Sequence, residues 1–330
     1  MENKITQGYE LFLEATKKLQ GSLNLSFFES FIENGGNIIE NFTTRVEEHL
    51  PDEQTELELN KIYQELKALT LEPEEWRKVA QLVLLFGIKE EPIQANHQMT
   101  PDSIAFLFAY FIEQLKGDKK EIILLDNTVG MANGLLTVIN QLSLSKIKVK
   151  AIGVENDDLL IDIASVNATL SKADIEFFLQ DGARRHESIQ ADFAIGDMPI
   201  GFYPDDQHAQ KFLTGSTSEH TFAHHLLVEQ AMLQVKENGY GIFLLPSELF
   251  KSKQADLMIQ WMKEKVYLQA VIQLPENLFK QKNSAKSIFI FQNHGALSKQ
   301  KTVLASNLSS LTDKKKIEQF FKEFANWKNN

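Results

Sequence analysis

The sequence predicts an α/β protein with a doubly wound, mostly parallel sheet of seven strands and a helical N-terminal domain. From about residue 96, short continuous apolar runs alternate with helical segments, which is typical of a parallel sheet covered on both faces. Before that point, apolar residues recur only at helical spacing. The 330 residues, of which 43% are hydrophobic, suffice for one large domain with a smaller companion.

The first 95 residues are predicted to be helical. Apolar side chains recur every three or four residues over 11–19, 27–32 and 57–66. Pro73 suits the first position of a further helix over residues 74–86, and Gly87 is expected to end that helix. We therefore predict a helical N-terminal domain over residues 1–95, with a role in interaction or shielding, and a second domain over residues 96–330.

The second domain is predicted to begin with a buried helix. Thr100 can cap this helix, Pro101 suits its first position, and residues 102–115 are apolar nearly all round. The seven strands are expected at residues 122–125, 149–154, 175–179, 193–195, 241–245, 270–274 and 287–291. Further helices are expected at residues 135–142, 161–170, 222–235 and 314–327.

The composition narrows the class of protein. The chain has no cysteine, which excludes disulfides, zinc–thiolate sites and a cysteine nucleophile, and which fits a reducing compartment. The N-terminus has no apolar signal core. The longest apolar run, residues 104–112, is shorter than the ~18 residues of a membrane span. We expect a soluble cytoplasmic protein without a membrane partner.

The net charge of −11 disfavours binding of a polyanion by this chain alone. Two groups of lysines offer local positive charge, and ordinary solvated side chains are the favoured interpretation of both. They are Lys146, Lys148 and Lys150, and Lys280, Lys282 and Lys286.

Acidic residues follow three successive strands of the predicted sheet. Asp126 precedes a loop that contains Thr128 and Gly130, and Glu155-Asn156 and Asp181-Gly182 follow the next two strands. A glycine turn lets backbone amides approach a ligand, while carboxylates at the next strand ends accept hydrogen bonds from ribose hydroxyls and an adenine amino group. Each element alone also fits a turn or a helix cap. The ordered set predicts a cleft for a nucleoside-bearing cofactor.

The loop after Asp126 does not match a dinucleotide fingerprint, because Gly130, Ala132 and Leu135 stand where Gly-x-Gly-x-x-Gly needs three glycines. Asp126 repels phosphate but suits the ammonium group of an amino-acid moiety. S-adenosyl-L-methionine (SAM) is therefore the better fit, and a nicotinamide dehydrogenase is the weaker alternative.

Residues 191–204 contain an apolar strand that ends in Asp197-Met198-Pro199-Ile200. This tetrapeptide resembles the Asp/Asn-Pro-Pro-aromatic motif of amino-group methyltransferases, which implies an aromatic amino nitrogen as the acceptor. The lone pair of such a nitrogen is delocalised, so the nitrogen is a poor nucleophile. The Asp197 carboxylate and the Met198 carbonyl can accept its two N–H groups and favour its pyramidal form. Pro199 supplies a rigid turn, and Phe202 or Tyr203 can supply an aromatic face that Ile200 lacks.

The order of these motifs resembles the class I SAM-dependent N6-adenine-specific DNA methyltransferase family. Residues 239–246, 271–279 and 287–291 are similar to the modification subunits of type I restriction systems, and a small stand-alone branch of Gram-positive bacteria matches best. The resemblance covers about residues 95–310. It implies a Rossmann-like methyltransferase fold whose last two strands form an antiparallel pair at one sheet edge.

The resemblance also implies roles for individual residues. Thr100 and Pro101 would lie over the methionine part of the cofactor, and Asp197 would hold the target amino group. The cofactor-binding residues would be Thr100, Pro101, Asp126, Thr128, Gly130, Glu155, Asn156, Asp181 and Gly182. The catalytic residues would be Asp197, Met198, Pro199, Ile200 and Phe202.

Several positions depart from the family pattern. Ile200 stands in place of the stacking aromatic residue, Asn127 in place of a proline, and Ala132 in place of a glycine. The alanine is strained if its φ is positive. After Phe291 only 39 residues remain, so target recognition is expected to come from the N-terminal helices or from a partner subunit. His220, His224 and His225 are not expected to bind a metal, because adjacent helical side chains point about 100° apart.

Two functions are consistent with these observations. The first is methyl transfer from SAM to an exocyclic amino nitrogen, with DNA as the family default and RNA, protein or a small molecule as other acceptors. The second is a catalytically impaired SAM-binding protein with a regulatory or assembly role.

Overall fold

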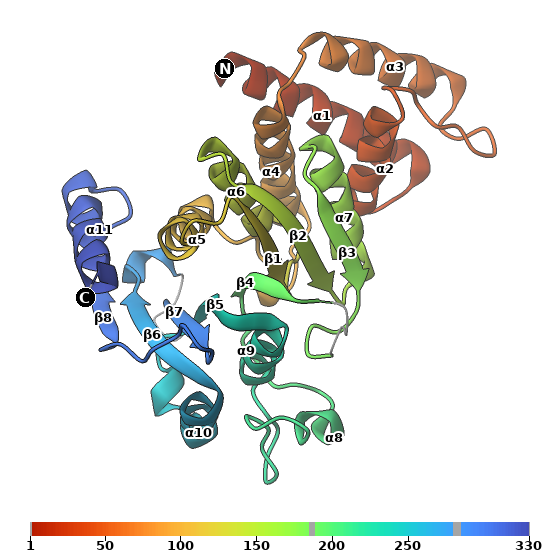
Figure 1. Cartoon of the computed structure of the whole chain (residues 1–330). Coiled ribbons are helices and arrows are strands. Elements are labelled where there is room, and N and C mark those ends of the chain that lie inside the picture. Colours follow the sequence, from red (N-terminus) through yellow and green to blue (C-terminus); the bar gives the residue numbers. More distant parts are fainter. Residues whose placement is uncertain (1, 185–188, 280–284, 330) are drawn as a thin grey trace.

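The computed structural model describes residues 2–184, 189–279 and 285–329, and it is built around one eight-stranded sheet. The strand order is β3-β2-β1-β4-β5-β7-β6-β8 (Figure 1). The strands are β1 (Glu121–Asp126), β2 (Lys148–Glu155), β3 (Ile175–Leu179), β4 (Ala191–Asp197), β5 (Val235–Pro246), β6 (Val266–Gln273), β7 (Lys286–Asn293) and β8 (Leu304–Asn307). The predicted doubly wound α/β fold is confirmed, and β8 adds an eighth strand to the seven expected.

The sheet is parallel except for β7, which runs antiparallel to both β5 and β6. Strand β8 pairs parallel to β6 and forms the edge. Because β7 runs against its neighbours, its first residue, Lys286, lies opposite the last residue of β5, Pro246. The start of β7 therefore reaches the sheet edge at which the parallel strands end.

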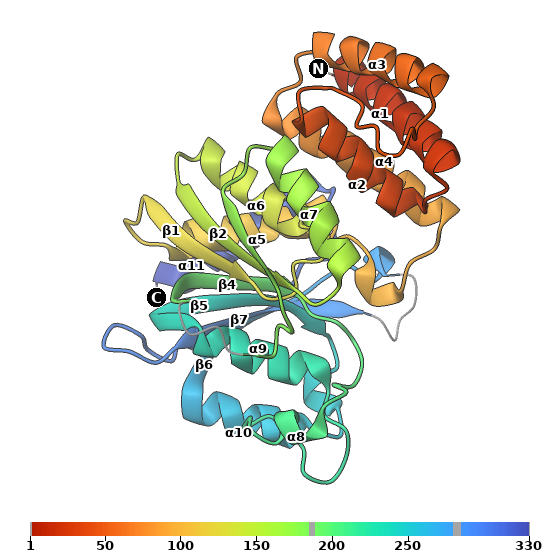
Figure 2. The same cartoon turned by 90° about the vertical axis from the view of Figure 1, so that its right-hand side faces the viewer.

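Helices cover both faces of the sheet (Figure 2). They are α5 (Asp102–Leu115), α6 (Asn133–Leu144), α7 (Asp158–Leu170), α8 (Asp206–Ala209), α9 (Ala223–Leu233), α10 (Ala255–Lys265) and α11 (Lys314–Asn329), with short 3-10 turns η1 (Ala95–His97), η2 (Leu249–Lys251) and η3 (Glu276–Leu278). One apolar cluster joins α5, α6 and α11 to the sheet, and a second joins α9 and α10 to its other face.

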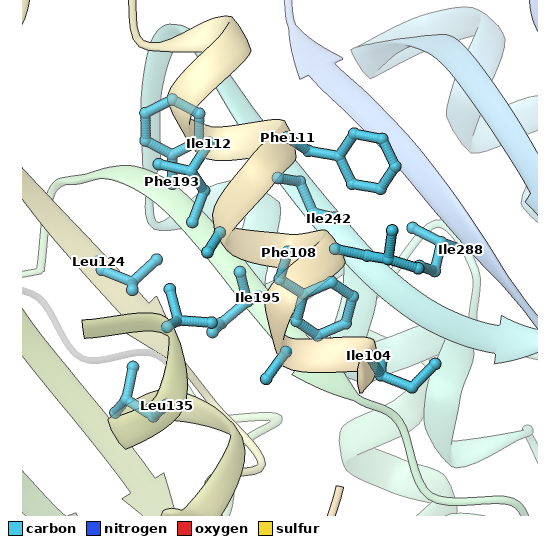
Figure 3. Close-up of a cluster of buried hydrophobic side chains, with 14 of the residues drawn as sticks. Ile104, Phe108, Phe111, Ile112, Leu124, Leu135, Phe193, Ile195, Ile242 and Ile288 are labelled. Carbon is cyan, nitrogen blue, oxygen red and sulfur yellow. The ribbon is translucent and has the colours of Figure 1, made fainter. Parts of the chain in front are cut away.

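Most of the helix α5 is buried against apolar residues, and one side, which carries Phe106 and Glu113, is exposed. Phe108 and Ile104 pack toward Ile195 of β4, Ile242 of β5 and Ile288 of β7 (Figure 3). The bounds of α5 agree with the prediction at both ends. Its packing fixes the segment before it, which contains Thr100 and Pro101, against the carboxyl edge of the sheet.

The prediction that Thr100 caps α5 is wrong. Pro101 takes the cap position and Asp102 begins the helix, so the Thr100 side chain does not cap it. The Thr100 hydroxyl instead lies 3.4 Å from Asp197 Oδ2, as a hydrogen-bond donor. The side chain that sequence analysis assigned to a helix end therefore belongs to the site.

Four α-helices lie before α5 in the described part of the chain: α1 (Glu2–Leu23), α2 (Phe27–Ile39), α3 (Glu53–Ala68) and α4 (Pro73–Glu90). The prediction that Gly87 ends the fourth helix is wrong. A Cβ atom at Gly87 would lie 2.4 Å from the Phe27 ring, so the glycine permits close packing of α4 on α2 and the helix continues through it. These helices share an apolar cluster with α7 and with Met131.

Within the described ranges, none of the helices combines the length and apolar character that crossing a bilayer requires.

Candidate cofactor and acceptor site

The carboxyl ends of four strands form one edge of the sheet, and the strand order reverses between β1 and β4. Open α/β sheets bind ligands at such a switch point. Asp126 ends β1 and Asp197 ends β4, on the two sides of this point, while Glu155 ends β2 and Asp181 follows β3. The structure therefore brings the four acids of the sequence analysis to one edge.

Asp126 lies deepest among these acids, with only 6% of its surface exposed. The Thr128 amide donates to its Oδ1 at 3.1 Å, and no donor among the described residues reaches Oδ2. Burial raises the pKa of Asp126 to about 7, and the nearby Glu155 and Asp197 charges add to the rise. A positively charged ligand at this position would relieve the cost of the buried carboxylate.

The loop after β1 contains two residues in the left-handed region. Gly130 has φ of 54°, and no atom lies within 4 Å of where its Cβ would be. Ala132 has φ of 64° and is fully buried, so it carries strain of about 1–2 kcal/mol that a glycine would not. The strain that the sequence analysis made conditional on a positive φ is present.

Glu155 shapes the same loop. The Gly130 amide donates to Glu155 Oε2 at 2.9 Å, and the Asn156 and Asp157 amides donate to Oε1 at 2.9 and 3.1 Å. Backbone donors thus orient both carboxylate oxygens, and Oε2, which accepts from one amide only, retains a second lone pair for a hydroxyl group. Gly130, Glu155 and Asn156 thus form one hydrogen-bonded unit, while Thr128 is bound to Asp126.

Asp181 has a partner that the sequence analysis did not identify. The Tyr203 hydroxyl donates to Asp181 Oδ2 at 2.5 Å, and the Ala183 amide donates to Oδ1 at 2.9 Å. Burial and the Asp181 charge raise the pKa of Tyr203. Tyr203 is buried. Of the two aromatic residues considered for stacking, Tyr203 is therefore the one bound to the acid that follows β3.

Asn127 stands where the resembling family usually has proline, and the structure gives it a bridging role. Its amide nitrogen donates to the carbonyls of Gly182, at 3.1 Å, and Leu227, at 2.9 Å. A Cβ atom at Gly182 would lie 2.1 Å from the Asn127 carbonyl oxygen. Glycine at 182 therefore lets the loops after β1 and β3 pack in direct backbone contact.

The Asp197-Met198 segment binds a lysine. Lys286 Nζ donates to Asp197 Oδ1 and, at 2.7 Å, to the Met198 carbonyl oxygen. The Met198 amide donates to the Leu244 carbonyl of β5 at 3.1 Å, which fixes the direction of this peptide. The side chains of Lys286 and Asp197 are 14% and 23% exposed.

The interpretation of Lys286 as a solvated side chain is therefore wrong. Its partner Asp197 is 89 residues away in sequence, and only the antiparallel insertion of β7 brings the two together. Lys280 and Lys282 lie outside the described residues. Lys146 and Lys150, and Lys148 between them, are exposed, as expected.

The residues after Asp197 present an apolar surface. The Asn96 side chain receives the Ile200 amide and donates to the Ile200 carbonyl, both at 3.1 Å. Phe202 is 59% exposed and stacks on Phe222 with ring centroids 5.0 Å apart. One face of Phe222 thus supports Phe202, an exposed aromatic side chain five residues after Asp197. Pro199 lies between Met198 and Ile200 in this loop.

The N-terminal helices are joined to the site by Arg77 of α4. This buried guanidinium donates to both oxygens of Asp102, at 3.2 and 3.0 Å, and to Asn133 at 3.3 Å. Asn133 in turn donates to the Thr100 carbonyl at 2.7 Å. The position of Thr100, beside Asp197, therefore depends on a helix that lies outside the sheet domain.

The three histidines form no metal site with one another. His220 lies within 3.0 Å of the exposed Asp206 carboxylate, and burial lowers the pKa of His224 to about 3 and that of His225 to about 4. The rings of His224 and His225 are 90° apart. Within the described parts of the chain, no group of three or more acidic or histidine residues is placed to hold a metal ion.

The sheet order, the glycine loop after β1 and the acids at the carboxyl edge define the class I methyltransferase fold. The chain belongs to the N-6 DNA methylase family, whose model matches residues 90–327, and residues 6–88 match the YtxK N-terminal helical domain. It is therefore assigned to the SAM-dependent methyltransferases.

Individual relatives are similar to this chain over most of its length. The YtxK protein of Bacillus subtilis (strain 168) is 35% identical over 320 residues, which are 97% of this chain and 96% of that protein. A structure from Listeria monocytogenes, assigned to the class I S-adenosylmethionine-dependent methyltransferases, is 37% identical with a TM-score of 0.90 over 99% of both chains. The type I restriction-modification methyltransferase subunit of Streptococcus thermophilus shares the fold, at 14% identity and a TM-score of 0.67 over 97% of this chain and 74% of that one.

Proposed function

We propose that the protein transfers a methyl group from SAM to an exocyclic amino nitrogen, with the N6 group of adenine in DNA as the acceptor. The observation that carries the proposal is the placement of Asp126 and Asp197 on the two sides of the β1–β4 switch point. One acid suits the ammonium group of the cofactor and the other suits an amino group, and the ends of adjacent strands hold both.

The residues around the glycine loop fit SAM. Asp126 Oδ2 would accept the ammonium group, and the remaining lone pair of Glu155 Oε2 would accept a ribose hydroxyl. Asp181, oriented by Tyr203, would accept from the adenine amino group. The open space at Gly130 supports a ligand lying against the backbone there. Thr100 and Pro101 would lie over the methionine part, with Thr128, Asn156 and Gly182 completing the cleft. When bound, SAM supplies a methyl group on a sulfonium leaving group.

The residues after β4 fit an amino acceptor. The carboxylate of Asp197 and the carbonyl of Met198 are two acceptors on adjacent residues, which suits the two N–H groups of one nitrogen. Accepting both favours a pyramidal nitrogen and stabilises the positive charge that develops as it is methylated. Pro199 would hold the turn, while Ile200 and the exposed ring of Phe202 would pack on the base.

Cofactor binding and methyl transfer test the proposal separately. Calorimetry should detect SAM binding to the wild-type protein and much weaker binding to Asp126→Ala. Asp197→Ala should keep cofactor affinity within about threefold, a change of under 1 kcal/mol, and lose transfer of labelled methyl groups into DNA. Wild-type protein that binds no SAM would refute the proposal, and equal transfer by Asp197→Ala would remove Asp197 from it.

A second candidate is a SAM-binding protein without turnover. The observation that favours it is that Lys286 already donates hydrogen bonds to both oxygens proposed to bind the acceptor. This candidate predicts SAM binding with no methyl transfer into DNA, RNA or the proteins of a cell extract.

We propose that the chain is divided near residue 95 into a helical domain and a methyltransferase domain. The likeness to subunits of type I restriction-modification systems supports a further proposal, that a partner subunit supplies target recognition. Size-exclusion chromatography of the protein purified from its host with and without nuclease would detect a stable partner.

A further inference from the structure

Lys286 occupies the position that the proposed function assigns to the acceptor nitrogen. Its ammonium group donates to Asp197 Oδ1 and to the Met198 carbonyl, the two oxygens suited to an amino group. A nitrogen atom from an acceptor cannot take the same place while Lys286 Nζ is there. Binding of the acceptor therefore requires Lys286 to leave.

This pair is part of the folded structure of the strand and is not a chance surface contact. Lys286 is the first residue of β7, opposite Pro246 of β5, and the Ala285 carbonyl before it accepts from the Ser247 amide at 2.9 Å. The hydroxyl groups of Ser247 and Ser287 lie 2.8 Å apart. The backbone on both sides of Lys286 is thus hydrogen-bonded to β5 and the residue after it, so movement of the side chain is the simplest way for Lys286 to leave.

It is unfavourable by itself for a neutral amino group of an acceptor to replace the Lys286 ammonium on the Asp197 and Met198 oxygens. Charge-assisted hydrogen bonds are stronger than neutral ones, so two N–H bonds from a base do not replace those of an ammonium. The exchange also leaves Asp197 ionised without its partner, in a site that holds Asp126 and Glu155 close enough to raise the pKa of Asp126. An acceptor with an anionic group beside the site would hold the Lys286 ammonium close to Asp197. The attraction between the two charges would then be retained in part, which lowers this cost.

We propose, on the basis of the proposed function, that Lys286 is a specificity-determining residue that admits amino bases carrying a phosphate group and excludes neutral nucleosides. The phosphate receives the Lys286 ammonium as it leaves Asp197, and the amino group takes the vacated oxygens. Phosphates pair readily with lysine, and in a nucleic acid they lie next to every base.

The experiment compares a neutral and an anionic probe. Affinities for deoxyadenosine and for a short single-stranded oligodeoxyadenylate are measured with the S-adenosylhomocysteine-bound protein, together with methyl transfer from SAM to each probe. The variants are Lys286→Met, which keeps the length of the side chain, and Lys286→Gln, which keeps one donor without the charge. Lys251→Met is the matched control, because Lys251 is an exposed lysine.

The wild-type protein and Lys251→Met should prefer the oligonucleotide strongly. In both Lys286 variants the ratio of the two affinities should fall by about tenfold or more, mainly because deoxyadenosine binds more tightly. An unchanged ratio with measurable methyl transfer would overturn the role of Lys286 and leave the proposed function intact. No binding and no transfer with either probe in any of the proteins would overturn both.

The ion pair between Lys286 and Asp197 is tested in the absence of an acceptor by lysine acylation followed by mass spectrometry. Lys286 should react much more slowly than Lys251 in the wild-type protein and at a comparable rate in Asp197→Asn. Reaction of wild-type Lys286 as fast as that of Lys251 would overturn the proposal.

Discussion

The buried carboxylate of Asp126 leads to a prediction about stability. Asp126→Asn keeps the shape of the side chain and its acceptor for the Thr128 amide but removes the buried charge. The pKa of Asp126 lies at about 7 in the folded protein against an ordinary value of 3.8. This displacement corresponds to about 4 kcal/mol of destabilisation when the group is fully ionised. The variant should therefore be more stable than the wild-type protein at alkaline pH.

The sign follows from which state holds the proton. At a pH below the ordinary pKa of aspartate, Asp126 is protonated in both the folded and the unfolded protein, so its charge does not destabilise the fold. Between this ordinary pKa and the pKa of the folded protein, the folded protein keeps the proton that the unfolded chain has lost. Its stability therefore falls as the pH rises. The advantage of Asp126→Asn should thus grow from under about 1 kcal/mol near pH 4 to about 4 kcal/mol near pH 8.

Urea unfolding across this pH range measures the difference, and Asp192→Asn is the matched control. Asp192 is also a buried aspartate, on β4, but Lys119, Lys236 and the Ile123 amide outweigh burial and hold its pKa below the ordinary value. Its ionised form stabilises the fold, so Asp192→Asn should lose stability at neutral pH, and the loss should shrink as the pH falls. An Asp126→Asn protein that is no more stable than wild type near pH 8, or a gap that does not grow with pH, would refute the reasoning.

The same substitution connects stability with function. If Asp126 binds the ammonium group of SAM, Asp126→Asn should weaken SAM binding by at least about tenfold, or about 1.4 kcal/mol, while it stabilises the protein. Calorimetry at about pH 8 measures this effect. Unchanged affinity would separate the buried charge from cofactor binding.

Three further predictions concern single residues near the site. Ala132→Gly should be less destabilising in urea unfolding than Ala109→Gly, a buried alanine within α5, by about 1 kcal/mol, because it relieves a left-handed φ; equal losses would contradict this. Gly196→Ala should weaken SAM binding in calorimetry, since its Cβ would lie 3.0 Å from Thr128 Oγ1 and 2.8 Å from Met198 Cε, and unaltered affinity would place the cofactor elsewhere. Phe202→Ala should change the free energy of unfolding by under about 0.5 kcal/mol but lower oligonucleotide affinity by about 1–3 kcal/mol; a large loss of stability would show that the ring is structural.

Features that depend on neighbouring residues were predictable from the sequence. The strands that place Asp126, Glu155 and Asp197 are short apolar runs, and an acid directly after each run must lie at its carboxyl end. The buried helix α5 was predictable for the same reason, because its apolar character is local. These local patterns were sufficient for the α/β class and for the edge at which the acids gather.

Some local features were missed because tertiary packing overrides propensity. Gly87 would end an isolated helix, but contact with Phe27 makes a glycine necessary at that point of α4. Strand β8 has only four residues and no long apolar run, and pairing with β6 alone defines it.

The partners of the acids were decided by tertiary structure alone. Tyr203 binds Asp181, Asn127 joins the loops after β1 and β3, and Lys286 binds Asp197 because the sheet brings distant segments to one edge. Hydrogen-bond partners 22, 55 and 89 residues apart leave no periodic signal in the sequence. The sequence thus determined which chemical groups reach the edge, since strand ends are local; the fold decided which of those groups are already paired, since pairing depends on strand order and direction.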